Sequence, residues 1–335
     1  MSRFPLLAAV SILLGALLAV PAQAAISRTY VASYGDDANT AYSCDFAHPC
    51  RTFQTAYSQV TTGGEVLALD GSGYGTLTID RSVSIIGNPG VFAGIGVFSG
   101  NGITIATAGV KVILRGLTIN GQGGSNGVRM SAGSSLLVEN CSFNGFSTSS
   151  TAAIYVSGSV TARIVNSTIA NSWSGVTLEN GPTATISGMK MLSMSEVGVW
   201  VHSTTAGATT TAFIDNTVVA AGTVAFNARA DDATTISRMH ITNSVASGAS
   251  FGVYVSGVGT EEVSVSGSLL STNTYGVYSN PSAPASRKVI LSGNTITFNS
   301  TGLYNGSGTM VVLGNNAVHS NGIASSGTIT SAATM

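Results

Sequence analysis

Three ionisable side chains with complementary chemistry occupy equivalent positions in three successive repeats of the chain. They are Glu179, His202 and Arg229, and the flanking repeats carry Ser157 and Ser256 at the same position. An arginine can neutralise a carboxylate through paired hydrogen bonds, and a histidine can take up a proton near neutral pH. We therefore expect Arg229 to hold a substrate carboxylate, His202 to remove the proton next to it and Glu179 to orient His202.

Two other interpretations of these residues stay open. Asp231 lies on the same face and adds a second carboxylate, but hydrolysis of a glycosidic bond needs two carboxyl groups about 5 to 9.5 Å apart. Glu179 and Asp231 are two repeats apart, so proton abstraction is favoured over hydrolysis. The remaining interpretation is a ladder of surface ion pairs without a chemical role, because such pairs form readily and contribute only about 0 to 1 kcal/mol.

A second column of residues, two positions before the ionisable one, is rich in aromatic rings. Side chains alternate between the two faces of a strand, so the third position of each Gly-Val-x-apolar segment is expected to face solvent. In successive repeats this position holds Arg129, Tyr155, Thr177, Trp200, Asn227, Tyr254, Tyr278 and Tyr304. Two interpretations are open: the rings stack on one another because aromatic residues favour exposed strands, or they form a platform for sugar rings.

Both columns follow from an internal repeat. A run of alternating apolar residues ends at Asn or Gly about every 25 residues, and these anchors are Gly116, Asn140, Asn166, Gly188, Asn216, Asn243, Gly267, Gly293 and Asn315. Each repeat contains two or three short alternating segments and no window of helical periodicity. Such units cannot bury their apolar faces alone and stack most simply as a parallel β-helix. We predict an all-β, single-domain, single-stranded parallel β-helix of roughly ten coils.

The third residue after each anchor is expected to fill the core of this solenoid. It is apolar in every repeat: Ile119, Phe143, Ile169, Met191, Val219, Ala246, Leu270, Ile296 and Val318. The anchor itself is expected to turn the chain, because Asn tolerates left-handed backbone and its amide can bond to a turn. We interpret the anchor asparagines as structural residues that satisfy buried turn groups.

A short amphipathic helix is predicted ahead of the repeats. Apolar residues recur at helical spacing from Phe53 to Val60, and Gly63 ends the run. We expect this helix to cover the first coil, because the open end of a β-helix exposes unpaired strand edges. The predicted organisation is a signal peptide over 1–24, a cap segment over 25–74 and the parallel β-helix over 75–335.

Composition limits the possible partners. The 335 residues include 13 Lys and Arg and 14 Asp and Glu, so the net charge is -1 and only 8% of positions are charged. No basic stripe can form, so nucleic acid is not expected as a partner. The hydrophobic share of 44% argues against disorder. We expect a monomer.

The first residues are typical of an export signal. Arg3 precedes an apolar run over 6–20, and small residues at 22–24 suit a cleavage site. The run is shorter than the about 20 residues of a membrane span. We therefore expect a periplasmic or extracellular protein without membrane insertion. In that oxidising setting we predict a disulfide between Cys44 and Cys50 and a buried free thiol at Cys141.

Metal binding receives little support from the sequence. Cys44 and Cys50 lack the further Cys or His partners that a metal site needs nearby. The segment Gly35-Asp36-Asp37 with Asn39 offers oxygen ligands for calcium, but a turn and cap role explains the same residues. We predict no cofactor and keep calcium as the weaker alternative.

The N-terminal segment carries a family resemblance. Its motifs are Tyr30-Val31, Gly35-Asp36-Asp37, Pro49-Cys50-Arg51-Thr52, Gly63-Gly64-Glu65-Val66 and Gly73-Tyr74. With the repeats behind it, the chain resembles secreted bacterial β-helix proteins of the pectin-lyase-like superfamily. The resemblance implies a right-handed solenoid and points toward polysaccharide lyases, hydrolases and epimerases. The clustered Asp residues of calcium-dependent pectate lyases and the signature motifs of polygalacturonases are lacking, so neither of those activities is expected.

These observations lead to two functional hypotheses. The first is an exported protein that binds an extracellular polysaccharide and acts on it, if at all, as a lyase. Its catalytic residues would be His202, Arg229 and Glu179, and its binding residues Trp200, Asn227, Tyr254, Tyr278, Tyr304, Tyr155 and Asp231. The second is a structural or adhesive surface solenoid without catalysis.

Overall fold

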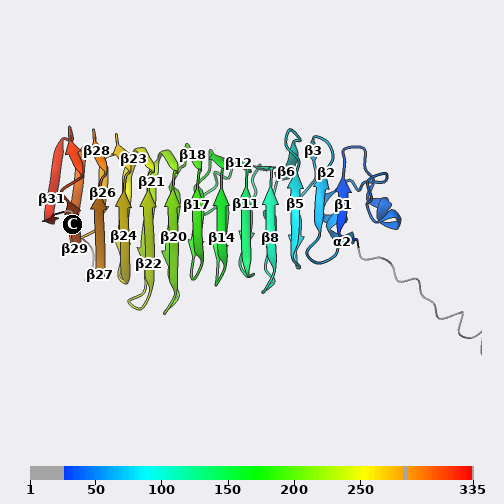
Figure 1. Cartoon of the computed structure of the whole chain (residues 1–335), viewed down its shortest axis with the longest axis horizontal. Coiled ribbons are helices and arrows are strands. Elements are labelled where there is room, and N and C mark those ends of the chain that lie inside the picture. The colour runs from blue at the N-terminus through cyan, green and yellow to red at the C-terminus, as the bar shows by residue number, and fades with distance from the viewer. Residues whose placement is uncertain (1–25, 282–285, 334–335) are drawn as a thin grey trace, which may run out of the picture.

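The chain forms a long solenoid of parallel strands (Figure 1). The computed structural model describes residues 26–281 and 286–333, so the signal peptide predicted over 1–24 lies outside the described residues. Strands of successive coils pair in parallel along the molecule. The prediction of an all-β parallel β-helix of about ten coils is confirmed.

Each coil contributes strands to three faces, which we name A, B and C and which the chain visits in the order B, C, A. Face A consists of β4 (Leu77–Ile79), β7 (Asn101–Ile105), β10 (Asn126–Met130), β13 (Ala152–Ser157), β16 (Ser174–Glu179), β19 (Val197–Ser203), β26 (Tyr275–Ser279) and parts of β21 (Val218–Ala230), β23 (Val245–Gly257), β29 (Thr301–Leu313) and β31 (Ile323–Ala332). Face B consists of β1 (Arg28–Val31), β2 (Glu65–Ala68), β5 (Val83–Gly87), β8 (Lys111–Arg115), β11 (Ser135–Glu139), β14 (Thr161–Val165), β17 (Thr183–Ser187), β20 (Thr209–Asp215), β22 (Ile236–Thr242), β24 (Thr260–Ser266), β27 (Ser286–Ser292) and the last parts of β29 and β31. Face C consists of β3 (Ser72–Gly73), β6 (Ala93–Val97), β9 (Leu117–Gly121), β12 (Ser142–Asn144), β15 (Thr168–Ala170), β18 (Lys190–Leu192), β25 (Leu269–Ser271), β28 (Thr295–Thr297), β30 (Ala317–His319) and the first parts of β21 and β23.

The predicted inward column forms one continuous strip of the core on face C. Its residues from Ile119 to Ile296 are buried, and Val318 in the last coils is partly buried against the core. Phe143 pairs with Ile119 on one side and Ile169 on the other. The column is apolar because every member meets its counterpart in the next coil, where a polar group would lack a hydrogen-bond partner.

The anchors turn the chain between faces B and C, as predicted. Asn140, Asn166, Asn216 and Asn243 have left-handed φ angles between 46° and 53°. The prediction that their side-chain amides satisfy buried turn groups is wrong. These four side chains are exposed because the left-handed corner turns them outward, so they do not line the buried face of the turn.

Buried asparagine ladders lie in other columns. At the corner between faces C and A, Asn299 accepts the backbone N–H of Asn273 at 3.0 Å and donates to the carbonyl of Leu270 at 3.0 Å. Its own N–H donates to the side chain of Asn321 at 2.9 Å. Asn299 therefore connects three coils through buried groups that have no access to water.

The N-terminal end is covered by helix α2 (Phe53–Gln59), one residue shorter than predicted, after the short helix η1 (Asp37–Tyr42). Thr52 caps α2, and Phe53 and Tyr57 are buried beneath it. The helix contacts β1, β2 and β4 at this end of the solenoid (Figure 1). Because β1 and β2 pair with each other, the predicted cap segment also contributes strands to face B.

The predicted disulfide and the predicted free thiol are both present. Cys44 and Cys50 form a disulfide, both cysteines are buried, and the bond ties the turn after η1 to the segment before α2, where Cys50 pairs with Val31 of β1. Cys141 is a buried free thiol.

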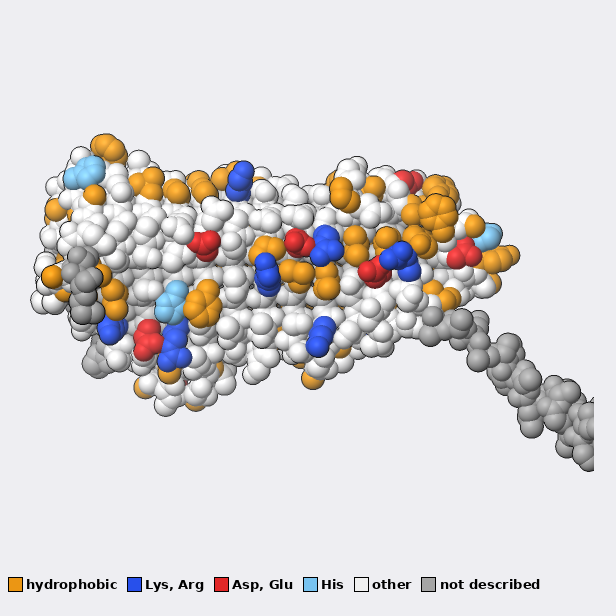
Figure 2. Space-filling view, viewed as in Figure 1, with side chains coloured by type: hydrophobic (Ala, Val, Ile, Leu, Met, Phe, Trp, Pro, Cys, Tyr) orange, Lys and Arg blue, Asp and Glu red, His pale blue; other side chains and the backbone are white. Residues whose placement is uncertain are grey.

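Charges on face B are arranged in pairs across neighbouring coils. Arg28 pairs with Glu65 at 2.8 Å, and Arg238 with Glu262 at 2.5 Å. Figure 2 shows blue and red side chains lying next to each other at several places along the molecule, separated by mainly uncharged surface. The charges of this face are therefore largely balanced locally.

One ion pair is inside the solenoid. Glu261 and Arg287 are almost fully buried and lie 3.0 Å apart. The guanidinium also donates to the carbonyl of Gly257 at 2.5 Å and to the hydroxyl of Ser307 at 2.8 Å. Burial raises the pKa of Glu261 to about 7, although the charge of Arg287 acts in the opposite direction.

We predict that Asn299→Ala lowers the free energy of unfolding by at least about 2 kcal/mol, because it leaves buried backbone groups of two coils without partners. Chemical denaturation followed by circular dichroism measures this change. Thr274→Ala, an exposed side chain in the same corner, serves as the control and should change stability by less than about 0.5 kcal/mol. Equal stability of the two variants would contradict the role of the ladder.

We also predict that the protein loses stability as pH rises from about 4.5 to about 7.5. The pKa of Glu261 in the folded state is raised from its ordinary value of 4.5 to about 7. Its contribution to the free energy of unfolding is therefore complete below about pH 4.5 and is lost as the pH rises through about 7. Thermal melting across this pH range should show a falling midpoint that Glu261→Gln flattens. Glu262→Gln, its exposed neighbour, should leave the slope unchanged; the same slope in all three proteins would refute the assignment.

Candidate functional site

Face A presents both predicted outward columns in the predicted register. The first column pairs Arg129, Tyr155, Thr177, Trp200, Asn227, Tyr254, Tyr278 and Tyr304 in sequence across neighbouring strands. In the second column Glu179 pairs with His202, and His202 with Arg229. Repeat counting along the chain therefore identifies which side chains are neighbours on this face.

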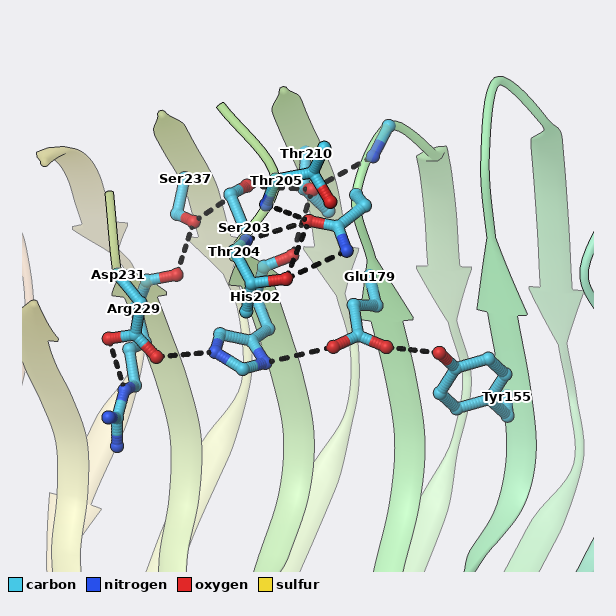
Figure 3. A network of polar contacts seen from close by, with 12 residues as sticks. Tyr155, Glu179, His202, Ser203, Thr204, Thr205, Thr210, Arg229, Asp231 and Ser237 are labelled. Carbon is cyan, nitrogen blue, oxygen red and sulfur yellow. Dashed lines mark hydrogen bonds and ion pairs between the residues drawn. The ribbon is translucent and has the colours of Figure 1, made fainter. Parts of the chain in front are cut away.

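A chain of polar contacts runs across four coils through His202 (Figure 3). Its Nδ1 lies 3.5 Å from Glu179 Oε1, and its Nε2 lies 3.0 Å from Asp231 Oδ2. The hydroxyl of Tyr155 donates to the other oxygen of Glu179, and Arg229 Nε donates to the other oxygen of Asp231 at 2.7 Å. We name these five residues, Tyr155, Glu179, His202, Arg229 and Asp231, the His202 cluster.

The His202 cluster is more buried than a surface ion-pair ladder. The side chain of His202 is 12% exposed, whereas that of Arg229 is 45% exposed. The hydrogen bond to His202 is the main cause that holds the pKa of Glu179 below its ordinary value, and the bond from Tyr155 adds to it. Burial raises the pKa of Asp231, but the contacts with Arg229 and His202 outweigh it and leave that pKa lowered. Both carboxylates therefore stay ionised at neutral pH.

The backbone beneath the cluster is held by hydroxyl groups from inside the solenoid. Thr210 Oγ1 donates to the carbonyl of His202 at 3.0 Å, and Ser237 Oγ donates to the carbonyl of Arg229 at 2.6 Å. Figure 3 shows Thr210, Ser203 and Ser237 in one polar network next to the cluster. These contacts restrict the strand ends that carry His202 and Arg229.

A groove of about 240 Å³ opens beside the cluster. Tyr155, Trp173, Trp200, Glu179 and His202 line it together with small residues. The ring of Trp200 stacks on that of His202, with centroids 4.6 Å apart and planes inclined by 15°. The sequence analysis missed Trp173, which precedes β16; its position just ahead of a Gly-Val-x-apolar segment is the only signal.

The three predicted tyrosines at the far end of the column form a separate aromatic platform. The rings of Tyr278 and Tyr304 stack 4.7 Å apart, and Tyr254 lies 5.6 Å from Tyr278. Phe251 and Tyr275 complete the platform, with ring centroids 4.8 Å from Tyr254 and Tyr278 respectively. All five rings are half-buried. Sequence analysis missed Phe251 and Tyr275, which directly precede the Gly of their segments.

Like Thr177, which is 7% exposed, Asn227 keeps the predicted register but not the predicted exposure. It is only 5% exposed, because it is a small side chain in register between the large rings of Trp200 and Tyr254. Its Oδ1 atom is buried and, among the described residues, has no hydrogen-bond partner; the same is true of Trp200 Nε1 and Ser256 Oγ. These three atoms lie on coils that flank or carry the His202 cluster.

The residues considered for calcium are used by the protein itself. Asp36 accepts the N–H of Ala38 at 2.9 Å, and Asp37 accepts the N–H groups of Arg51 and Thr52 at 2.9 Å each. The turn and cap role therefore accounts for the contacts of both carboxylates. Within residues 26–281 and 286–333, no three His, Cys, Asp or Glu side chains are grouped so that they could hold a metal ion.

We predict that the His202 cluster stabilises the fold above about pH 4. The pKa values of Glu179 and Asp231 are lowered in the folded state, so their contribution is present above their ordinary values and is lost as pH falls through the folded values. Thermal melts of a Glu179→Gln, Asp231→Asn double variant should show a shallower loss of stability in acid than wild type. Glu139→Gln removes one partner of an ion pair on face B and is the control. The same loss of melting temperature in acid for wild type and the double variant would contradict the prediction.

Known proteins support the fold. A family model described as a right handed beta helix region matches residues 101–248. The chain is similar to the crystal structure of pectate lyase Pel9A, with a TM-score of 0.57, 14% sequence identity and coverage of 90% of this chain and 78% of that one. No curated protein matches the sequence.

No helix among the described residues is long and apolar enough to cross a lipid bilayer. The strands, their parallel register and the two matches agree with one architecture. The chain is a right-handed parallel β-helix, a fold that it shares with pectate lyase Pel9A.

Proposed function

We propose that the protein binds a polysaccharide along face A. The observation that carries this proposal is the aromatic platform, five half-buried rings gathered on three coils beside the groove and the His202 cluster. From Tyr155 to Tyr304 the column crosses six coil steps, about 29 Å at the spacing of neighbouring strands. A surface of this length suits an extended polymer better than a single sugar.

The chemistry of the platform fits sugar rings. Aromatic side chains offer apolar area to the C–H groups of a sugar, and tyrosine hydroxyls at the rim offer hydrogen bonds. The amide of Asn280 donates to the hydroxyl of Tyr254 at 2.7 Å, so this ring is held at its polar edge as well as by stacking. A platform fixed in this way loses little conformational entropy when a ligand binds.

An exported protein would meet such a polysaccharide outside the cytoplasm. The disulfide between Cys44 and Cys50 suits an oxidising compartment, and the predicted signal peptide would direct the chain there. We therefore place the proposed activity in the periplasm or outside the cell.

A second candidate is lyase chemistry on a uronate polymer at the His202 cluster. The specific observation is that Arg229 uses Nε for Asp231, while its two Nη atoms have no hydrogen-bond partner among the described residues. Those atoms would bind the uronate carboxylate in bidentate fashion. The longer contact of His202, 3.5 Å to Glu179, is the one that would be exchanged for substrate.

The proposed step balances without a cofactor. His202 takes the proton from the carbon next to the carboxylate, and the released electron pair forms a carbon–carbon double bond. The bond from the neighbouring carbon to the glycosidic oxygen breaks, and that oxygen takes a proton from water. Asp231, on the other ring nitrogen, would stabilise the protonated His202.

We predict that replacing Tyr254, Tyr278 and Tyr304 together by alanine weakens binding to a retained glycan at least tenfold, since each lost stacking contact is worth about 0.5 to 1.5 kcal/mol. A glycan array with the chain from residue 25 onward identifies the ligand, and titration measures the loss. Tyr34→Ala, an exposed ring in the cap, is the control and should bind like wild type. Circular dichroism verifies that each variant is folded. Absence of binding to any glycan would favour the structural or adhesive alternative.

The lyase candidate makes a separate prediction. Incubation with a panel of uronate polymers should produce unsaturated ends that absorb in the ultraviolet, and His202→Ala should abolish this signal. Thr185→Ala, on face B away from the cluster, should retain it. No signal from wild type on any polymer would end the lyase proposal, and an equal signal from the variant would remove His202 from it.

A further inference from the structure

The groove beside the His202 cluster combines aromatic walls with one carboxylate. Tyr155, Trp173 and Trp200 provide the rings and Glu179 the charge. The rings of the two tryptophans are 6.4 Å apart and inclined by 54°, so they form two sides of a box rather than a stack. This composition differs from that of the aromatic platform, whose rings pack on one another and include no acidic residue.

Aromatic faces of this kind attract cations. The electron-rich face of Trp or Tyr binds an ammonium group within about 6 Å of the ring centre, and aromatic boxes recognise methylated ammonium groups in this way. Tyr155 already has one such contact, because the guanidinium of Arg129 in the preceding coil lies 4.4 Å from its ring centroid. Tyr155 also lines the groove, and its hydroxyl donates to the carboxylate of Glu179.

The charge of the groove favours a cation as well. Glu179 stays ionised, because the hydrogen bonds from His202 and Tyr155 lower its pKa. Those two contacts use one lone pair on each oxygen, and a carboxylate can accept about four hydrogen bonds. Arg229 is paired with Asp231 at 2.7 Å, and Arg129, whose charge also lowers the pKa of Glu179, is held over the ring of Tyr155.

The geometry points to an alkylammonium site: we propose that this groove binds the ammonium group of a choline headgroup or of an amino sugar. A volume of about 240 Å³ accommodates such a group together with the atoms next to it. The ionised carboxylate of Glu179 attracts a cation, whereas it adds no charge attraction for a neutral sugar and repels a carboxylate placed in the groove. The inference goes beyond the proposed function, because it concerns the groove and does not depend on the aromatic platform.

Intrinsic fluorescence tests the site directly. The chain contains two tryptophans, Trp173 and Trp200, and both line the groove, so a change in emission reports on this place. The protein is titrated with choline chloride and, separately, with glucosamine. Sodium chloride at matched ionic strength, glucose and 3,3-dimethyl-1-butanol, the uncharged isostere of choline, serve as controls. We expect a saturable change with at least one ammonium ligand and with none of the controls.

A charge-removing variant completes the test. Glu179→Gln keeps the shape of the side chain and should weaken the ammonium ligand roughly tenfold, by loss of the ionic attraction to the bound cation. Glu262→Gln on face B should bind like wild type. A response to choline alone or to glucosamine alone identifies the source of the ammonium group. No saturable response, an equal response to the isostere, or unchanged binding by Glu179→Gln would each overturn the inference.

The two proposals fail in different ways. If the glycan array succeeds and the platform variant loses binding while no ammonium ligand changes the emission, the alkylammonium site is wrong and the proposed function stands. If choline or glucosamine binds while no glycan is retained, the groove is confirmed and polysaccharide binding is refuted. The comparison of wild type with the isostere needs no variant, so the result does not depend on the folding of Glu179→Gln.

Discussion

Hydrogen bonding between consecutive coils is the interaction on which the rest of the structure depends. Each strand pairs in parallel with its counterpart one coil further on, so equivalent residues stack about 4.8 Å apart. A slip of one residue would move every core side chain to the surface, which makes the register strict. The corners reinforce it: the anchors turn the chain in left-handed conformation, and Asn273, Asn299 and Asn321 tie neighbouring coils at another edge. The positions of surface groups therefore follow from counting along the chain, without help from long loops.

This regularity lets a chain with few charges concentrate them. Only 8% of the residues are charged, yet Glu179, His202 and Arg229 follow one another on adjacent coils, with Asp231 bonded to the last two. Each ionised group has an oppositely charged or hydrogen-bonding neighbour, so partial burial of His202 carries little electrostatic cost. Because inner hydroxyls hold the strands beneath, the charges stay in place without a ligand, and a ligand would meet a preorganised surface.

The repeat made much of the fold and of face A predictable, and local side-chain packing made the rest unpredictable. Strict alternation and the anchor spacing were enough to place Trp200, Tyr254 and Tyr278 in one column. The burial of Asn227 depends on the size of its neighbours in other coils, which no single repeat reveals. Glu261 looks like an exposed charge next to Glu262, but it shares the inward face of β24 with Val263, and the buried Arg287 that pairs with it lies in the next coil. Phe251 and Tyr275 directly precede glycines, at a position where other repeats carry Asn, Ser, Val or Thr, so periodicity alone gave no reason to group them with the column.

The corner between faces B and C has a consequence for how such a chain can change over evolution. From β11 to β28, two residues separate the face B strand from the following face C strand in every coil, whereas the connection from face A to face B varies, with three residues between β13 and β14 and five between β19 and β20. An insertion at the left-handed corner would break the stacking on both sides, while one between faces A and B only enlarges an exposed loop. New recognition elements can therefore be acquired at the latter corner, beside Asp231, without disturbing the framework.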